Sequence, residues 1–428
     1  MKRRTFLNVL AGIGMGNVLP MTLISPVFGE TPERFLITIS ASGGWDPTAF
    51  VDPKGNALRA DGRGPINNYA ASAIKSAGNL QYAPYPTSVT PPAIDSPGHL
   101  DNFFTKHHQR LLVINGIDTQ TNSHDSGSRF VWSGRLEEGF PSVGALVAAP
   151  YAGQPMAFIS TGGYDYTASL VSAVRTSSAG TFASLAYPNS QYADSATNRK
   201  LTYFSESAYS AVQIARDARL ARLQSAESLP RRSEQMQRLK LARSSDEQLE
   251  RLLANMPATI SAGIKGHAEV AVAAFASGLA ASANLSQGGF DTHATHDVSQ
   301  TNALTQLLDG IDHLWTQIEQ RGLQNKVTIL IGSDFGRTPF YNTGAGKDHW
   351  NVTSVMAMGA GVTGNRVIGS TSQNFEALKL SPGTLQPHSL GVTITPKHIH
   401  RALRDYLGVS SDLNRQFPIS AEPLALFG

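Results

Sequence analysis

Short apolar runs that end in glycine, serine or an acid recur along the chain and predict buried β-strands. The clearest runs are "RFLITISAS" (34–42), "RLLVINGI" (110–117), "MAFIST" (156–161) and "KVTILIGSDF" (326–335). Helical patterns lie between them, such as "TQLLDGIDHLWTQIEQRG" (305–322), whose apolar residues recur at helical spacing. Buried strands that alternate with helices predict a doubly wound, mostly parallel sheet with helices on both faces.

Three segments depart from this alternation. Residues 206–256 are rich in charge, leucine and alanine, and predict a helical insertion of two amphipathic helices broken near Pro230 and packed over the sheet. Residues 54–98 are rich in proline, glycine, serine and asparagine, which predicts a long ordered loop. The tail 395–409 predicts a helix with a Thr-Pro start and a glycine stop.

The first thirty residues predict an export signal. A basic start is followed by a mildly apolar run and a small-residue exit, and Arg3-Arg4-Thr5-Phe6-Leu7 resembles the twin-arginine pattern. We expect a signal peptide at 1–29, a mature domain at 30–428, the twin-arginine machinery as a partner, and a periplasmic or otherwise exported location. An uncleaved anchor is the alternative. No later segment predicts an integral membrane span.

Charge and composition exclude some partners and some metal sites. The formal net charge is +3, and all of it comes from Lys2, Arg3 and Arg4, since basic and acidic residues are otherwise equal in number. With no basic stripe, nucleic acid is not an expected partner. The chain has no cysteine, so a metal would be held by nitrogen and oxygen ligands, which suit zinc, manganese, magnesium or calcium.

Polar residues that suit metal chemistry follow the predicted strands. They are Asp46 after the first strand, Ser123, His124 and Asp125 after the second, Asp291, His293 and His296 in "SANLSQGGFDTHATHD" (282–297), and Asp334, Arg337, Asp348 and His349 after the last. In open α/β sheets, ligands bind beyond the carboxyl ends of the strands. We therefore expect these side chains to gather at one edge of the sheet.

Clustered carboxylates repel one another and lose hydration, and divalent cations relieve both costs. The residues suffice for up to two ions. Arg337 would offer a planar fork to a phosphate or sulfate oxygen, and Ser123, at the start of a predicted helix 124–133, would be a nucleophile. Each residue also has a structural interpretation. Asp46 suits a helix cap, His124 a buried histidine, and Asp291 an Asx-turn.

Four other histidines are assigned to the surface or to packing. His107 and His108 precede a predicted strand, at the end away from the expected site, and we expect them at the surface. His398 and His400 lie on the C-terminal helix, where packing or solvent explains them.

The chain resembles the DUF1501 family, exported bacterial proteins placed with the alkaline phosphatase and sulfatase superfamily. The matching motifs are "SGGWD" (42–46), "NSHDSGSRF" (122–130), "GGFDTH" (288–293), "GSDFGRTP" (332–339), "GKDHWN" (346–351) and "GAGVTGNRVIG" (359–369). They follow the family's order along nearly the whole chain after the leader. The resemblance implies an alkaline-phosphatase-like sheet and two metal ions.

The resemblance also implies how the ligands divide between the two ions. Asp46 and Asp334 would share one ion, and Asp291, His349 and either His293 or His296 would bind the other. Many relatives have histidine where Phe335 stands here, so one ligand is missing unless His124, Asp125 or Asp348 replaces it. The family carries no established activity to transfer.

Two functions follow from these residues. The first is an exported metal-dependent hydrolase that acts on a small-molecule or polymer ester of phosphate or sulfate. The alternative is a non-catalytic cell-envelope protein that keeps the fold with a degenerate metal site and serves in binding or assembly. The loss of a ligand at Phe335 favours the alternative, whereas the retained acids and histidines favour the hydrolase. A serine hydrolase without metal is disfavoured, because the chain lacks a G-x-S-x-G turn.

Overall fold

The computed structural model describes residues 32–175, 187–191, 201–233, 236, 246–257 and 259–428. The predicted signal peptide at 1–29 lies outside these residues. In the part of the chain that the structure describes, no helix combines the length and the hydropathy that a bilayer span requires.

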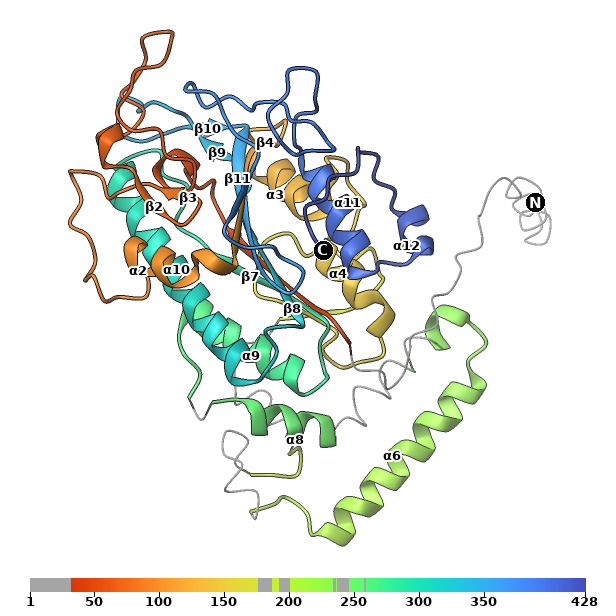
Figure 1. The fold of residues 1–428 in the computed structure, drawn as a ribbon. Helices are drawn as coiled ribbons and strands as arrows, with labels where there is room; N and C mark the ends of the chain where they lie inside the picture. Colours follow the sequence, from red (N-terminus) through yellow and green to blue (C-terminus); the bar gives the residue numbers. More distant parts are fainter. Residues whose placement is uncertain (1–31, 176–186, 192–200, 234–235, 237–245, 258) are drawn as a thin grey trace, which may run out of the picture.

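An eight-stranded sheet forms the centre of the molecule (Figure 1). Its strand order is β12-β4-β11-β8-β1-β7-β5-β6. The strands are β1 (Phe35–Ala41), β4 (Leu111–Asp118), β5 (Phe158–Ser160), β6 (Ala173–Val174), β7 (Ser282–Gln287), β8 (Val327–Gly332), β11 (Val352–Gly359) and β12 (Arg366–Ile368). All pairings are parallel except those of β11 with β4 and β8. The prediction of a mostly parallel sheet is therefore confirmed.

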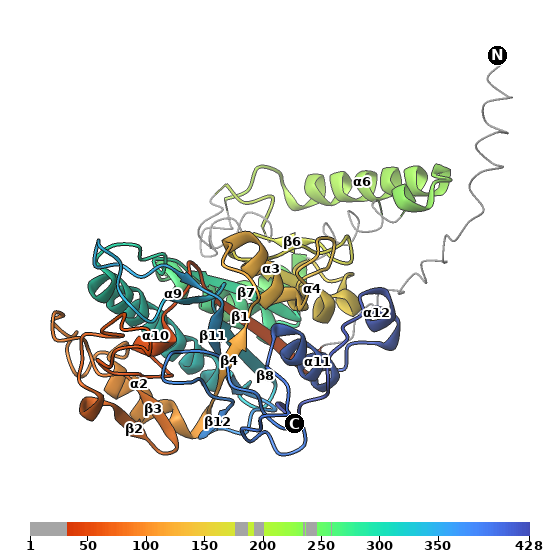
Figure 2. The ribbon, with the colours of Figure 1, turned by 90° about the horizontal axis from the view of Figure 1, so that it is seen from above.

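Helices cover both faces of the sheet (Figures 1 and 2). One face carries α2 (Leu100–His107), α9 (Gly263–Ala276) and α10 (His296–Gln320), and the other carries α3 (His124–Ser133), α4 (Val143–Ala148) and α11 (Pro396–Leu407). Short α12 (Ser411–Gln416) follows α11. Two small ribbons, β2 (Lys75–Ala77) with β3 (Leu80–Tyr82) and β9 (Gly336–Arg337) with β10 (His349–Trp350), lie outside the main sheet.

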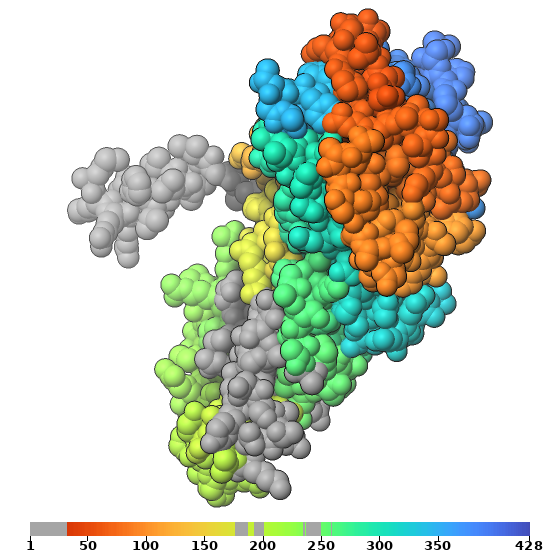
Figure 3. Space-filling model, turned by 90° about the vertical axis from the view of Figure 1, so that its left-hand side faces the viewer, coloured from red at the N-terminus to blue at the C-terminus, as the bar shows by residue number. Residues whose placement is uncertain are grey.

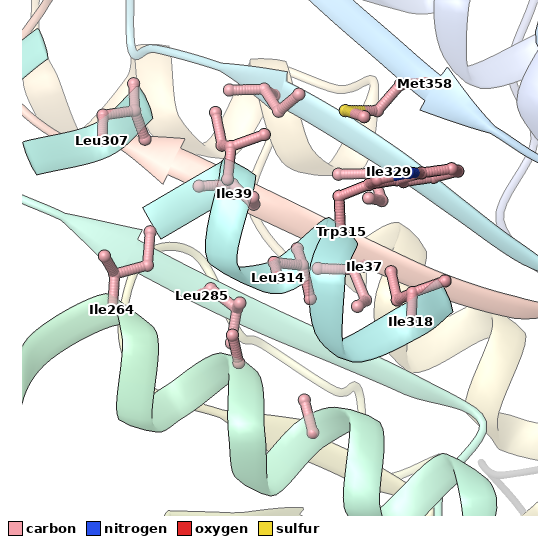
Figure 4. Packing of buried hydrophobic residues seen from close by; sticks show 14 of the residues in the cluster. Ile37, Ile39, Ile264, Leu285, Leu307, Leu314, Trp315, Ile318, Ile329 and Met358 are labelled. Atoms are coloured by element: carbon pink, nitrogen blue, oxygen red, sulfur yellow. The ribbon is translucent and has the colours of Figure 1, made fainter. Parts of the chain in front are cut away.

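The central strand β1 supplies both faces with apolar side chains. Ile37 and Ile39 belong to the core beneath α9 and α10, whereas Leu36 belongs to the core beneath α3 and α11. Figure 4 shows Ile37 and Ile39 close to Leu314 and Trp315 of α10. A strand buried on both faces explains the continuous apolar run that predicted it.

Strand β11, between β4 and β8 in the sheet, is among the elements that the sequence patterns do not predict. Two of its residues are polar, but they are satisfied inside the fold. Thr353 accepts a hydrogen bond from the Trp45 indole N–H at 3.0 Å, and Ser354 bonds the Asn115 side chain at 2.6 Å. These long-range partners make a buried strand from a segment whose own apolar pattern is weak.

The predicted insertion forms α6 (Glu206–Ala226) and α8 (Asp246–Asn255), and the first helix ends near Pro230 as expected. Figures 1 and 2 both show α6 apart from the sheet. Leu220 is its one buried residue, and Ile214 is 68% exposed. The expectation that this helix packs over the sheet is wrong, because its apolar residues do not gather on one face.

Residues 54–98 are ordered and include the β2–β3 ribbon. This segment, red-orange to orange in Figure 3, covers part of the surface beside α10. Asn68 donates a hydrogen bond to the Asp297 carboxylate of α10 at 2.8 Å, and Tyr85 accepts one from the Leu100 N–H at 2.9 Å. The predicted long loop thus packs as part of the body.

The expectation that His107 lies at the surface is wrong. Its side chain is fully buried, and its Nε2 atom lies 2.8 Å from the carboxylate of Asp312 on α10. Phe103 packs on the same imidazole, with 4.8 Å between the ring centroids. His400 is also buried and bonds the Val131 carbonyl at 2.8 Å, in line with a packing role.

Truncation of a side chain in β1 should destabilise the protein strongly. Ile37 is fully buried, so Ile37→Ala should lower the free energy of unfolding by about 2–5 kcal/mol. Val367 of the edge strand β12 is 40% exposed, and Val367→Ala should change it by about 0.5 kcal/mol or less. Denaturant titration of both variants measures the difference. Equal losses would show that β1 is not the centre of the core.

Candidate metal centre

The carboxyl ends of β1, β4, β7 and β8 lie at one edge of the sheet, because these strands run in the same direction. Asp334 follows β8 and accepts a hydrogen bond from the Gly43 N–H, after β1, at 3.1 Å. Its other partner is His124, after β4, whose Nδ1 atom lies 2.8 Å from the same carboxylate oxygen. Polar groups that follow three strands thus meet at this edge.

A short hairpin returns the glycine-rich segment to this edge. β9 and β10 pair antiparallel, with His349 opposite Arg337. The Asn342 side chain closes the loop between them by accepting hydrogen bonds from the N–H groups of Gly344 and Gly346, both at 2.9 Å. A Cβ atom at Gly346 would lie 1.9 Å from the His293 backbone, so the close approach of the two segments requires glycine.

Three histidines and one aspartate converge at this edge, and we call them the candidate metal centre. Around the Asp291 Oδ1 atom, the Nε2 atoms of His293, His349 and His124 lie at 3.1, 3.4 and 3.5 Å. The Nε2 atoms of His293 and His349 are 3.0 Å apart. Ligands about 2.0–2.1 Å from a zinc ion stand about 3.3 Å apart in a tetrahedron. The ligand atoms of His124, Asp291 and His349 all lie within 4.8 Å of one another and fit one bound ion, and His293 lies beside this trio, against Asp291 and His349.

Each of the three imidazoles is held from behind by an oxygen acceptor. The Nδ1 atom of His124 faces Asp334 at 2.8 Å, that of His293 faces Asp348 at 2.8 Å, and that of His349 faces the Asn122 carbonyl at 2.7 Å. These acceptors require a proton on Nδ1. Hydrogen-bonded support of this kind orients metal-binding histidines and fixes their tautomer.

This tautomer turns unshared electron pairs toward the centre. With Nδ1 protonated, each neutral ring presents a bare Nε2 atom to its neighbours and to the Asp291 carboxylate. The Asp291 oxygen and the Nε2 atoms within 3.5 Å of it repel one another unless a cation or an added proton lies between them. Imidazole nitrogens with a carboxylate oxygen form a donor set that divalent transition metals prefer. His124, Asp291 and His349 can therefore hold a metal ion, with His293 beside them.

The charges around the centre set the protonation of its members. Burial opposes ionisation of Asp291, but its hydrogen bond to Arg337 and the nearby charges outweigh this and lower its pKa to about 2. Burial and the Arg337 charge also lower the pKa of His349, which favours the neutral ring that binds metal. The hydrogen bond to Asp334 raises the pKa of His124.

A second polar group lies behind the centre, and we call it the Lys347 pocket. It comprises Lys347, Asp46, Thr48, Asn67 and His296, all of them buried. The ammonium of Lys347 lies 2.5 Å from Asp46 Oδ2, 2.7 Å from Asn67 Oδ1 and 3.3 Å from Thr48 Oγ1. The Nε2 atom of His296 lies 3.0 Å from the same Asp46 oxygen.

The Lys347 pocket keeps its aspartate charged. Burial alone would raise the pKa of Asp46, but the Lys347 charge and His296 hold it well below its usual range. Burial, with the Lys347 charge, lowers the pKa of His296, so the ring is neutral. A buried carboxylate requires such pairing, since an unpaired one costs several kcal/mol.

The family model "Protein of unknown function (DUF1501)" matches residues 33–395, which is most of the chain. The chain belongs to this family. No curated protein matches the sequence.

Distant solved structures also align with this DUF1501 protein. The lipoteichoic acid synthase LtaP from Listeria monocytogenes is 8% identical, with a TM-score of 0.37, over 92% of this chain and 75% of the other. A 2-O GAG sulfatase is 10% identical, with a TM-score of 0.34, over 89% of this chain and 71% of the other. The phosphonate monoester hydrolase of Agrobacterium radiobacter is 12% identical, with a TM-score of 0.34, over 88% of this chain and 74% of the other.

In the structure, the expected ligands of the DUF1501 protein are not grouped around two ions in the way that the family resemblance implies. His293, and not His296, faces Asp291. Asp334 and Asp348 face Nδ1 atoms and orient the histidines. Asp46 does not share a site with Asp334, because its carboxylate is occupied by Lys347 and His296 and caps the turn at Thr48.

Arg337 has a different place from the one expected. Its side chain is fully buried, and its guanidinium donates to the carbonyls of Gly43, Gly44 and Lys347 and to Asp291 Oδ1, the last at 2.7 Å. A guanidinium enclosed in this way cannot offer a fork to a substrate oxygen. Arg337 is instead a positioning residue that holds Asp291.

The remaining predicted residues lie near the centre in distinct roles. Ser123 is exposed at the N-terminus of α3, next to His124, and its side chain makes no capping hydrogen bond. Asp125 pairs with Arg129 and points to solvent. Phe335 is buried, and its ring centroid lies 4.8 Å from that of His124 and 4.3 Å from that of His349. His124 thus joins the cluster while Phe335 supports the rings.

Sequence analysis missed Lys347, together with Thr48 and Asn67 of its pocket. The position of Lys347 beside Asp348 and His349 in "GKDHWN" was the available signal. A lysine in a glycine-rich loop is ordinarily exposed, so its burial could not be read from the sequence.

Replacement of the carboxylate behind His124 should lower the pKa of this imidazole. The ion pair favours the protonated ring, so its contribution to stability is complete below the unfolded-state pKa of about 6.5 and is lost as the pH rises through the raised folded-state pKa. In metal-free protein, Asp334→Asn should shift the His124 NMR titration to lower pH. Asp348→Asn, which acts on His293, is the control and should leave it nearly unchanged. An unaltered titration in Asp334→Asn would contradict the assigned orientation.

Proposed function

We propose that this DUF1501 protein is an exported, metal-dependent hydrolase of phosphate or sulfate esters. The observation that carries the proposal is the convergence of three imidazole Nε2 atoms on the Asp291 carboxylate, each ring already oriented through its Nδ1 atom. This arrangement is prepared for a divalent ion, drawn from zinc, manganese, magnesium or calcium, with nitrogen donors favouring zinc and manganese over the last two. Such an ion supplies Lewis-acid polarisation of an ester oxygen.

The site is open to a substrate. The side chains of Asp291, His293 and Asp348 are 52%, 47% and 51% exposed, although Asp334 and Arg337 behind them are buried. Reacting groups can therefore approach from solvent while the supporting residues stay fixed. Catalysis requires side chains that substrate can reach and that their neighbours hold rigidly in place.

The start of α3 supports an anionic ester as substrate. Ser123 precedes the first turn of this helix, and its exposed hydroxyl stands next to His124. The free N–H groups and the dipole at a helix N-terminus stabilise negatively charged groups such as phosphate or sulfate. Ser123 is accordingly the proposed nucleophile, and the first turn of α3 would bind the oxygens of the ester.

The export proposal rests on the leader sequence. Lys2, Arg3 and Arg4 precede a mildly apolar run, and Arg3-Arg4-Thr5-Phe6-Leu7 fits the twin-arginine pattern. The twin-arginine machinery carries folded proteins, so the metal would be bound before transport.

A structural role for the ion is the second candidate function. With His293 as a fourth donor beside His124, Asp291 and His349, the candidate metal centre would complete a tetrahedral set, as in structural zinc sites, whereas catalytic sites keep a position for water or substrate. In that case the protein would be a non-catalytic envelope protein whose fold the ion stabilises.

Variants of the site distinguish the two functions. Purified protein loaded with zinc or manganese should hydrolyse an aryl phosphate or an aryl sulfate ester. Asp291→Asn should lose bound metal and lower the activity by about 100-fold or more. Ser123→Ala should lower the activity while bound metal, measured by elemental analysis, is unchanged.

Asp125→Asn is the matched control, because Asp125 lies on the same turn of α3 but faces solvent. It should retain activity and metal. If the wild type binds metal and gains thermal stability from it but turns over neither ester class, the structural role is correct and the hydrolase proposal is wrong.

A further inference from the structure

We propose that the ammonium of Lys347 takes the place of a second metal ion in this DUF1501 protein. The protein would then bind one metal ion, at the candidate metal centre. The second positive charge would be the ammonium of Lys347. The inference rests on the proposed function for the metal ion. Its test counts ions rather than turnover, so the two can fail separately.

The Lys347 pocket has the chemistry of a cation site. A carboxylate, an amide oxygen and a hydroxyl converge on one point, and they belong to Asp46, Asn67 and Thr48. An imidazole nitrogen of His296 lies beside the same carboxylate. These are the donor types that bind divalent metals in proteins. The point on which they converge holds the Nζ atom of Lys347.

Charge balance argues against a metal ion beside Lys347. The pocket contains one carboxylate, one ammonium and a neutral imidazole, so its formal charge is zero. All five side chains are buried, and Asp46 and Lys347 have no exposed surface. A divalent ion added here would place two uncompensated charges in a desolvated site, which is strongly unfavourable.

The backbone places Lys347 directly behind the candidate metal centre. The Lys347 N–H donates to the Thr292 carbonyl at 3.0 Å, and Thr292 stands between Asp291 and His293. The Lys347 carbonyl accepts from Arg337 at 2.9 Å. The Thr292 hydroxyl in turn bonds Nδ1 of His296 at 2.7 Å. The internal cation therefore lies where the two segments that carry the metal-binding residues meet.

Removal of the ammonium should open a latent metal site. Lys347→Ala removes the charge and vacates the space, and it leaves the oxygen and nitrogen donors in place. Lys347→Met also removes the charge but fills the space with an apolar chain of similar length. The two variants therefore separate a site for a cation from a simple loss of packing.

The experiment measures bound zinc or manganese per chain by elemental analysis after gel filtration, together with the metal-induced rise in Tm. The wild type should hold one ion, Lys347→Ala two, and Lys347→Met one. Lys347→Ala should also gain more in Tm on adding metal than Lys347→Met does. Two ions in the wild type, or equal counts in the two variants, would overturn the proposal.

A second measurement covers the case in which Lys347→Ala does not fold. Anomalous scattering from crystals of metal-loaded wild type should show a single peak, among the three histidines and Asp291. A peak beside Asp46 would overturn the role of Lys347. A wild type without any bound ion would overturn the proposed function, whereas a gain of one ion in Lys347→Ala over Lys347→Met would still support the latent site.

Discussion

The carboxylate oxygen of Asp291 is the point on which the candidate site depends. It accepts a 2.7 Å hydrogen bond from a buried guanidinium on one side and faces three imidazole nitrogens on the other. Arg337 can hold it only because carbonyls of two different segments enclose the rest of the guanidinium. The anion is thus fixed in place before any ligand arrives, and the histidines around it are fixed by Asp334, Asp348 and the Asn122 carbonyl. Preorganisation of this kind reduces the ordering cost of binding an ion.

The direction of the strands explains why these residues meet. Parallel neighbours deliver their carboxyl ends to one edge, so residues more than 150 positions apart in the sequence become contacts there. The antiparallel strand β11 adds to this arrangement, because its first residue, Val352, lies at that same edge, two positions after Trp350.

Much of the fold and part of the site could be predicted from the sequence. Fully buried strands are continuous apolar runs, so β1, β4 and β8 could be predicted. Because ligands bind beyond the carboxyl ends of such strands, Asp291, Asp334 and His349 were then expected to gather. Local pattern could not show which nitrogen of each histidine faces the ion, because that depends on acceptors from other segments. The burial of Lys347, the paired His107 and the polar residues of β11 were hidden for the same reason. Each is stabilised by partners distant in the sequence.

The segment 333–351 is held at both ends by adjacent strands, since β8 leads into it and β11 leads out of it. Within it, the β9–β10 pairing closes off the stretch from Thr338 to Asp348 as a separate loop. Changes of length at the tip of that loop, near Thr343, would leave the backbone of His349 in the β9–β10 ribbon but would displace Asn342, which donates to the His293 carbonyl and to Asp348. The loop that shapes the approach to the ion therefore also sets the orientation of His293, so a change in one is carried into the other.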